Sequence, residues 1–122
     1  MHGFNDIVGF IMNEDEPVVS IKLINGILQE CNILGTRANL PPEFWLCDCK
    51  ERAFELFIQD RVPPATRIGI NEDVKRVGLP YYDKELLLRF QHGYAVDDPY
   101  WIKFEDDEIG TYEQLKQFLG LM

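Results

Sequence analysis

The stretch VVSIKLINGILQECNI, residues 18–33, decides the fold. Its first part, residues 18–23, places an apolar side chain at every second position, the period of a β-strand. Asn25-Gly26 follows, a dipeptide preferred in two-residue hairpin turns. Residues 27–33 then alternate again, so the whole stretch predicts a β-hairpin.

A third strand is predicted before this hairpin. Residues 6–12, DIVGFIM, are apolar and rich in side chains that favour strands. Residues 13–17, NEDEP, form a strong turn signal between this run and the hairpin. An apolar run, a turn and a hairpin in this order predict a three-stranded antiparallel meander at the N-terminal end.

One long helix is predicted after the meander and a loop over residues 34–40. Pro41 and Pro42 suit the first turn of a helix, and the apolar pattern continues to about Asp60. The apolar residues, from Trp45 to Ile58, cover much of the girth of this helix rather than one narrow stripe. Such a helix is buried from two directions, either by the sheet and another helix or partly by a partner.

Two or three short helices are predicted in the second half of the chain. Asn71 and Asp83 are suited to cap two of them, and Gly93 is suited to end the second. Thr111 with Gln114 three residues later forms a capping box for a last helix.

The order of these elements indicates the fold class. Residues 61–69 are expected to be extended because each proline disfavours helix in the residue before it. Residues 100–104, YWIKF, predict a short strand or extended segment. Strands that come first and helices that follow are typical of an α+β fold. A length of 122 residues without repeat or linker indicates one domain, residues 1–122.

Composition excludes some classes of partner. The hydrophobic fraction of 46% is sufficient for a core. A net charge of −9 without any basic stripe disfavours direct binding to nucleic acid or to an anionic membrane. The odd number of cysteines, three, and the absence of a signal-like start predict a reducing, cytoplasmic location. No apolar run has the length of a membrane span.

The sequence offers little catalytic or metal-binding chemistry. Cys47 and Cys49 lack the spacing of a zinc knuckle, and His2 and His92 are the two histidines. No Gly-rich phosphate loop and no G-x-S-x-G motif occur. We therefore expect a protein that is not an enzyme, without catalytic residues, metal ligands or cofactors. A small enzyme or ligand-binding domain is a further hypothesis, but it requires a pocket that the sequence does not indicate.

Charged residues gather in two places. From Gly93 onward, seven acidic residues and two lysines give that segment a charge of −5, with four of the acids adjacent at residues 105–108. This run is either a solvated loop or an electrostatic contact for a basic partner. Arg61 and Arg67 flank the proline segment, where they either clamp the loop or present guanidinium groups to an acidic ligand.

Several of these segments resemble a known family. They are residues 34–36 (LGT), Trp45, residues 61–70 (RVPPATRIGI), residues 86–88 (LLL) and residues 97–102 (DDPYWI). Together they resemble the N-terminal region of HipA-type kinase-like toxin proteins, especially their divergent Firmicutes branch. The resemblance covers about residues 18–118.

The resemblance implies a regulatory role. In that family this region precedes a kinase core with ATP-binding and catalytic residues, and this chain ends before such a core. The resemblance therefore implies a detached N-terminal module without kinase activity. Such a free-standing piece is associated with restraining the kinase subunit, as an antitoxin restrains a toxin.

Two functions remain as hypotheses. The first is a non-catalytic, cytoplasmic regulator that binds a protein partner such as a kinase-like subunit. The second is an acidic phage or mobile-element inhibitor that mimics nucleic acid and blocks a basic nucleic-acid-binding protein, such as a defence nuclease. The expected partner-binding residues are Trp45, Arg61, Arg67, Asp97, Asp98, Tyr100, Trp101, Glu105, Asp106, Asp107 and Glu108.

Overall fold

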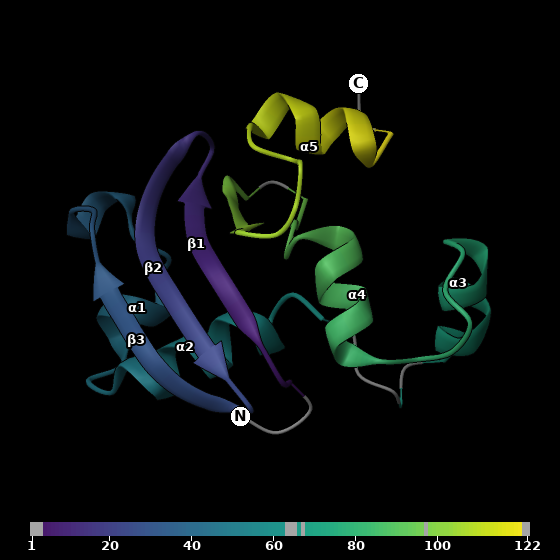
Figure 1. The fold of residues 1–122 in the computed structure, drawn as a ribbon, viewed down its shortest axis with the longest axis horizontal. Helices are drawn as coiled ribbons and strands as arrows, with labels where there is room; N and C mark the ends of the chain where they lie inside the picture. The colour runs from purple at the N-terminus through teal and green to yellow at the C-terminus, as the bar shows by residue number, and fades with distance from the viewer. Residues whose placement is uncertain (1–3, 63–65, 67, 97, 121–122) are drawn as a thin grey trace.

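The predicted hairpin and meander form the centre of the molecule. The computed structural model describes residues 4–62, 66, 68–96 and 98–120. Asn25 and Gly26 have φ angles of 52° and 76°, as a tight hairpin turn requires. Three strands precede the helices, β1 (Ile7–Asn13), β2 (Glu16–Ile24) and β3 (Ile27–Ile33) (Figure 1). Each pairs antiparallel with the next, so the predicted meander is confirmed.

A fourth strand completes the sheet from the other end of the chain. The predicted strand at residues 100–104 is β4 (Tyr100–Phe104), and it pairs antiparallel with β1. The order across the sheet is β3-β2-β1-β4. The α+β class is therefore confirmed, with one strand arriving after most of the helices.

Gly9 allows β1 and β4 to approach closely. It pairs with Phe104 on one side and with Ile21 on the other, at the middle of the sheet. A Cβ atom at this position would lie 2.0 Å from the carbonyl oxygen of Lys103. Only glycine fits there without moving the backbone of β4.

The predicted long helix is wrong in one respect, because the chain forms two helices there. They are α1 (Glu43–Leu46) and α2 (Lys50–Gln59). Cys47 and Cys49 between them have extended backbone angles. Cysteine and aspartate are weak helix formers, so residues 47–49 give little resistance to a break. α2 then buries Ala53, Phe54, Phe57 and Ile58, whereas none of the residues of α1 is fully buried.

The short helices follow the predictions closely. They are α3 (Ile70–Arg76), α4 (Lys84–Gln91) and α5 (Tyr112–Phe118), together with a 3-10 turn, η1 (Arg37–Asn39). Asp83 caps α4 by accepting a hydrogen bond from the Leu86 backbone N–H, and the capping box at α5 is present.

One predicted helix start differs by two residues, and one predicted helix end is confirmed. The N-cap of α3 is Gly69, whose φ of 79° reverses the chain, and Asn71 lies inside the helix. The C-cap of α4 is His92, with φ of 55°, and Gly93 follows it with φ of 66°, as predicted for the residue directly after the helix.

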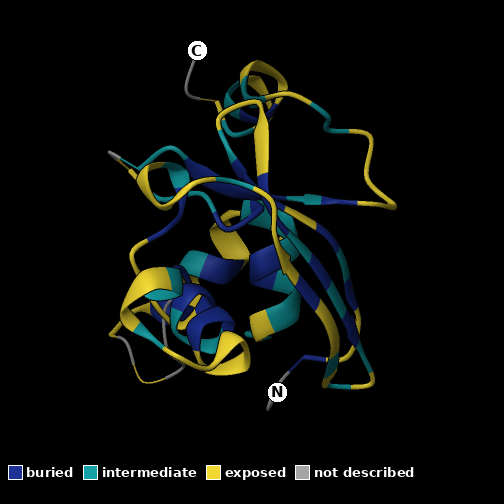
Figure 2. Cartoon of the chain, turned by 90° about the vertical axis from the view of Figure 1, so that its left-hand side faces the viewer, coloured by how far each residue is buried: buried dark blue, intermediate teal, exposed yellow. Residues whose placement is uncertain are grey.

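The helices divide the sheet into two unequal sides. The main core lies on the side covered by α1 and α2, where Phe54 and Phe57 meet the strand residues, and α3 and α4 extend it sideways (Figures 1 and 2). A second, smaller cluster lies against α5 and contains Met12, Trp101 and Leu115. Within the described residues, no helix combines the length and apolar character needed to cross a membrane.

Replacing Phe54 by alanine tests the role of α2. Phe54 is fully buried in the main core, so Phe54→Ala should lower the free energy of unfolding by about 3–5 kcal/mol, the range for emptying a buried aromatic site. Urea denaturation would measure the loss. Phe10→Ala is the matched control, because Phe10 is 38% exposed and should lose much less. Equal losses in the two variants would contradict this core.

Candidate functional site

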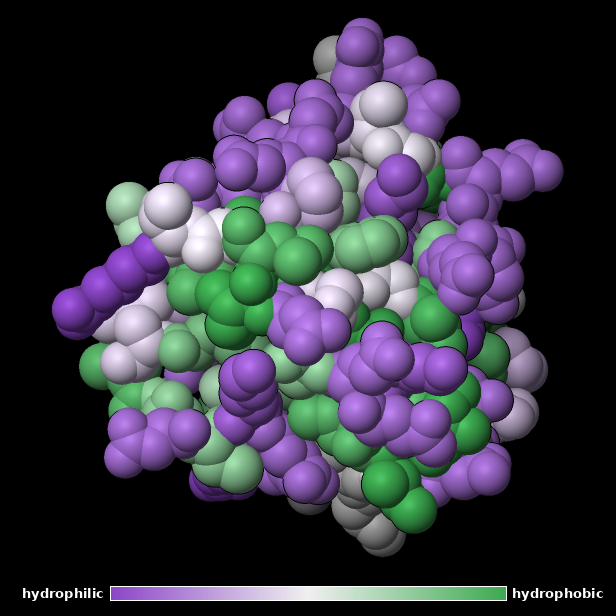
Figure 3. Space-filling model, turned by 60° about the vertical axis from the view of Figure 1, so that its left-hand side comes forward, coloured by the Kyte–Doolittle hydropathy of each residue, from purple (hydrophilic) through white to green (hydrophobic). Residues whose placement is uncertain are grey.

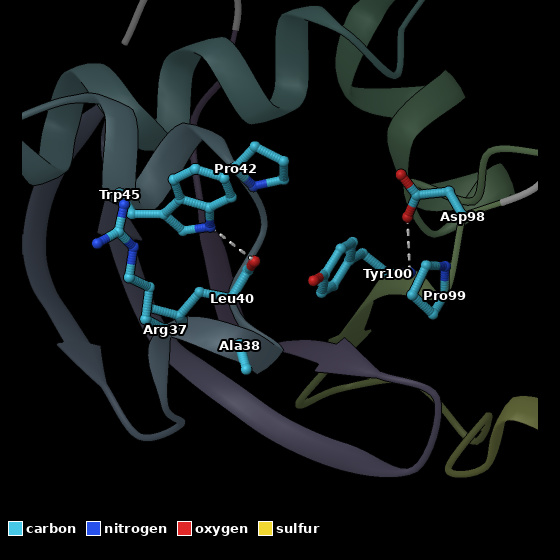
Figure 4. A pocket seen from close by; sticks show the side chains of 8 residues that line it. All are labelled: Arg37, Ala38, Leu40, Pro42, Trp45, Asp98, Pro99 and Tyr100. Atoms are coloured by element: carbon cyan, nitrogen blue, oxygen red, sulfur yellow. Dashed lines mark hydrogen bonds between the residues drawn. The ribbon is translucent and has the colours of Figure 1, made fainter.

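An open pocket brings together three of the predicted partner-binding residues. It has a volume of about 660 Å³ and lies between η1 and α1 on one side and the entry to β4 on the other (Figure 4). Trp45, Asp98 and Tyr100 are the predicted residues that it contains. The lining is completed by Arg37, Ala38, Leu40, Pro42 and Pro99.

The first wall of the pocket depends on Trp45. The break after α1 leaves Trp45 43% exposed and the neighbouring Leu46 73% exposed. The indole Nε1–H of Trp45 donates a hydrogen bond to the Leu40 carbonyl oxygen at 3.2 Å, which fixes the ring against residues 37–40. The guanidinium of Arg37 lies 5.0 Å from the centre of that ring, in cation–π contact. Trp45 is thus held in place while one part of it faces solvent.

The second wall depends on Arg61, at the end of α2. Its guanidinium donates to the carbonyl oxygens of Gly93 at 2.8 Å and Tyr100 at 3.2 Å, and forms an ion pair with Asp98 at 2.7 Å. It also lies 4.1 Å from the centre of the Phe57 ring. Arg61 is only 8% exposed. It therefore clamps the backbone, the first of its two predicted roles, and does not present its charge to a ligand.

Burial changes the titration of two groups beside this clamp. Burial raises the pKa of the Glu43 carboxyl, and the nearby carboxylates of Asp60 and Asp98 add to the effect, while Arg61 opposes it. Burial also raises the pKa of the Tyr100 hydroxyl, with Asp98 and Glu43 contributing. Oε1 of Glu43 and Nε of Arg61 are buried without a hydrogen-bond partner among the described residues. Behind the pocket, the carboxyl groups of Glu43, Asp60 and Asp98 thus lie near the single guanidinium of Arg61.

Trp101 lies inside the protein rather than on a binding surface. Its side chain is fully buried against Met12 and Leu115, and its Nε1–H donates to the Glu14 carbonyl oxygen at 2.6 Å. Two other predicted residues, Arg67 and Asp97, lie outside the described residues, as do Pro63 and Pro64 of the expected extended segment. Of the aromatic residues predicted to bind a partner, Trp45 and Tyr100 remain in the pocket lining.

The acidic run is exposed, and two of its members have partners within the chain. Glu105, Asp106, Asp107 and Glu108 are all exposed residues between β4 and α5. Asp106 pairs with Arg89 at 3.3 Å, and Asp107 lies 2.9 Å from Nε2 of His92. Within the described residues no ion pair involves Glu105 or Glu108. The run therefore stabilises the end of α4 through half of its carboxylates.

His92 is the buried partner of this contact. It is 1% exposed and packs against the rings of Phe104 and Phe118 at 5.4 Å and 6.0 Å between centres. Its Nδ1 has no hydrogen-bond partner among the described residues. Desolvation alone would raise the pKa of the Asp107 carboxyl. The hydrogen bonds from the Ile109 backbone and from His92, together with the charge of His92, lower this pKa by more than desolvation raises it, so the net shift is downward.

The described residues do not assemble a metal centre. No three His, Cys, Asp or Glu side chains among them are placed to hold a metal ion. The three cysteines are free, and burial raises the pKa of the Cys31 thiol. The pocket lining is mostly apolar, with Arg37 and Asp98 as its two charged residues.

The sequence analysis missed several residues of the pocket. Arg37, Leu40 and Pro42 lay in a segment expected to be a loop and a helix start, and nothing in that composition marks them.

Apolar side chains reach the surface on the side of the molecule that carries β3 and α1 (Figure 3). The exposed large apolar residues of these elements and the loop after β3 are Ile27, Ile33, Leu34, Trp45 and Leu46.

No protein family, curated protein or solved structure was found that matches this chain.

Replacing Arg61 tests the clamp. Arg61→Ala removes one partner of a largely buried ion pair and leaves two carbonyl oxygens without a donor, so it should destabilise the fold by about 3 kcal/mol or more. Chemical denaturation would measure this. Arg52→Ala is the control, because Arg52 pairs with Glu55 on the surface with 59% of its side chain exposed, and should cost less than about 1 kcal/mol. Similar losses for the two arginines would contradict the clamp.

Asp107 should contribute stability that depends on pH. Because its folded-state pKa lies below the ordinary value of 3.8, the contribution is complete above that value and is lost as the pH falls through the lower, folded-state pKa. Asp107→Asn should lower the melting temperature at pH 7 by about 4 °C, the equivalent of roughly 1 kcal/mol. The difference from the parent should shrink between pH 4 and pH 2. Glu108→Gln is the control, and a constant difference for Asp107→Asn across this range would contradict the assignment.

Proposed function

We propose that this protein is a non-catalytic regulator that docks onto another protein through the pocket between Trp45 and Tyr100. The observation that carries the proposal is the fixed but solvent-facing indole of Trp45, opposite Tyr100 across an open pocket. Tryptophan, tyrosine and arginine are the residues that most often dominate the energy of protein interfaces. This pocket offers one of each.

Pre-organisation supports a docking role for this surface. Contacts within the chain hold both walls. The Trp45 indole donates to the Leu40 carbonyl oxygen, and Arg61 donates to the Tyr100 carbonyl oxygen and lies 6.0 Å from the centre of the Tyr100 ring. Side chains that are already fixed lose little conformational entropy when a partner binds. The exposed Leu46 beside Trp45 extends the apolar area available to a partner.

The family resemblance supplies the class of partner. Trp45 and residues 98–100 belong to the segments similar to the N-terminal region of HipA-type proteins, and they lie on opposite walls of the pocket. We therefore take the partner to be a kinase-like subunit. This protein, once bound, would restrain that subunit as an antitoxin restrains a toxin. A cytoplasmic location is part of this proposal, and the three free cysteines are compatible with a reducing compartment.

The pairing within the acidic run favours this proposal over mimicry of nucleic acid. A mimic needs carboxylates that are available to basic groups of the target. Asp106 and Asp107 already face Arg89 and His92 of the same chain. The dependence of binding on salt separates the two functions, because affinity based on a charged surface falls steeply as salt screens it.

Affinity capture from the native host tests the proposal. The parent protein should retain a kinase-like protein, and Trp45→Ala should weaken that complex by about 2 kcal/mol, roughly 30-fold, as expected for an interface hot spot. Ile27→Ala is the matched control, because Ile27 is 66% exposed but does not line the pocket. Titration calorimetry with the purified pair would give both affinities.

Three outcomes would contradict the proposal. The first is that no kinase-like protein is retained under conditions that preserve weak complexes. The second is that Trp45→Ala binds as tightly as the parent. The third is that binding disappears when salt is raised from low to physiological concentration, which would favour the nucleic-acid mimic.

A further inference from the structure

The charge that the pocket offers to a ligand is positive, although the whole protein is acidic. Arg37 and Asp98 are the two charged residues in the lining. Asp98 is already occupied, since its Oδ2 pairs with Arg61 at 2.7 Å and its Oδ1 accepts the Tyr100 backbone N–H at 2.7 Å. The negative charge of Asp98 therefore stabilises the wall of the pocket and is not available to a ligand.

Arg37 has no such internal partner. Its side chain is exposed, and within the described residues no ion pair involves it. The guanidinium carbon lies 5.0 Å from the centre of the Trp45 ring. Stacking leaves the N–H groups in the plane of the guanidinium available, and their fork matches the two oxygens of a carboxylate.

The Trp45 ring links this guanidinium to the apolar part of the pocket. Trp45 contacts Arg37 and also lines the pocket together with Pro42, and its ring lies between the guanidinium and the facing rings of Pro99 and Tyr100 (Figure 4). Surfaces of tryptophan, tyrosine and proline suit an extended segment that inserts an aliphatic or proline side chain. An extended ligand that fills this space and continues across the Trp45 ring reaches Arg37 with its neighbouring residues.

We propose that the pocket recognises an acidic, extended segment of the partner protein, with an apolar or proline side chain between Trp45 and Tyr100 and a carboxylate on Arg37. The inference rests on the proposed docking function and specifies the chemistry of the bound segment. The net charge of −9 does not prevent this contact, because salt screens charges beyond about 8 Å at physiological ionic strength. The guanidinium of Arg37 therefore decides which charge the pocket prefers in a bound segment.

Selection from a displayed library of random 12-residue peptides tests this chemistry. The purified full chain is the bait, and fluorescence polarisation gives the affinity of each selected peptide. The selected sequences should contain an apolar or proline residue next to Asp or Glu. Arg37→Gln should weaken their binding at least tenfold, and changing the peptide's acid to its amide should cause no further loss in that variant.

Two variants control the interpretation. Arg52→Gln removes an exposed arginine that does not line the pocket and should bind the peptides like the parent. Trp45→Ala should abolish binding, since it removes the ring under Arg37 and part of the lining. The melting temperature of each variant confirms that it is folded, and Arg37→Gln is expected to fold because its side chain is on the surface.

The outcomes separate this inference from the function on which it rests. Peptides that need Trp45 but lack acids, or that bind Arg37→Gln as well as the parent, would overturn the acidic-segment inference alone. A basic consensus that needs Trp45 would also overturn it. Failure to select any peptide, or selection of peptides indifferent to Trp45→Ala, would overturn the docking function itself.

Discussion

The buried guanidinium of Arg61 is the constraint on which the rest of the structure depends. It joins the end of α2, the turn after α4 and the start of β4 through contacts with Asp98, Gly93 and Tyr100. Arg61 thus joins two parts of the chain, since Gly93 and Tyr100 lie 32 and 39 residues beyond it in sequence. Burial of its charge is costly unless such partners surround it. The position of one pocket wall follows directly from this requirement.

Local rules were sufficient to predict most of the fold. Alternation and Asn25-Gly26 predicted the hairpin, and the caps at Asp83 and Thr111 predicted the starts of two helices, because each signal acts over a few residues. The break in the expected long helix was missed. Cys47 and Cys49 look like ordinary apolar positions of a buried helix, and tertiary packing outweighed that pattern.

The candidate site was predicted only in part, because it depends on contacts between segments that are distant in the sequence. Composition pointed to Trp45, Asp98 and Tyr100, but it did not distinguish Trp101, which faces the opposite side of the sheet. Neighbouring residues in a strand point to opposite faces, and the helix that covers one face cannot be assigned without the tertiary structure. Arg37 gains its significance only from the ring of Trp45 beside it, which is a contact between segments that the sequence does not reveal.

The late arrival of β4 has a consequence for the order of events during synthesis. Gly9 pairs with Phe104, so this strand joins a meander made almost a whole chain earlier. Contacts between residues so far apart in sequence carry a large loop-closure entropy and tend to form slowly. The nascent meander and α1 thus carry one wall of the pocket while the residues of the other are still being translated. The pocket is complete only once residues 98–104 have emerged from the ribosome and paired with β1, so its formation reports completion of the fold.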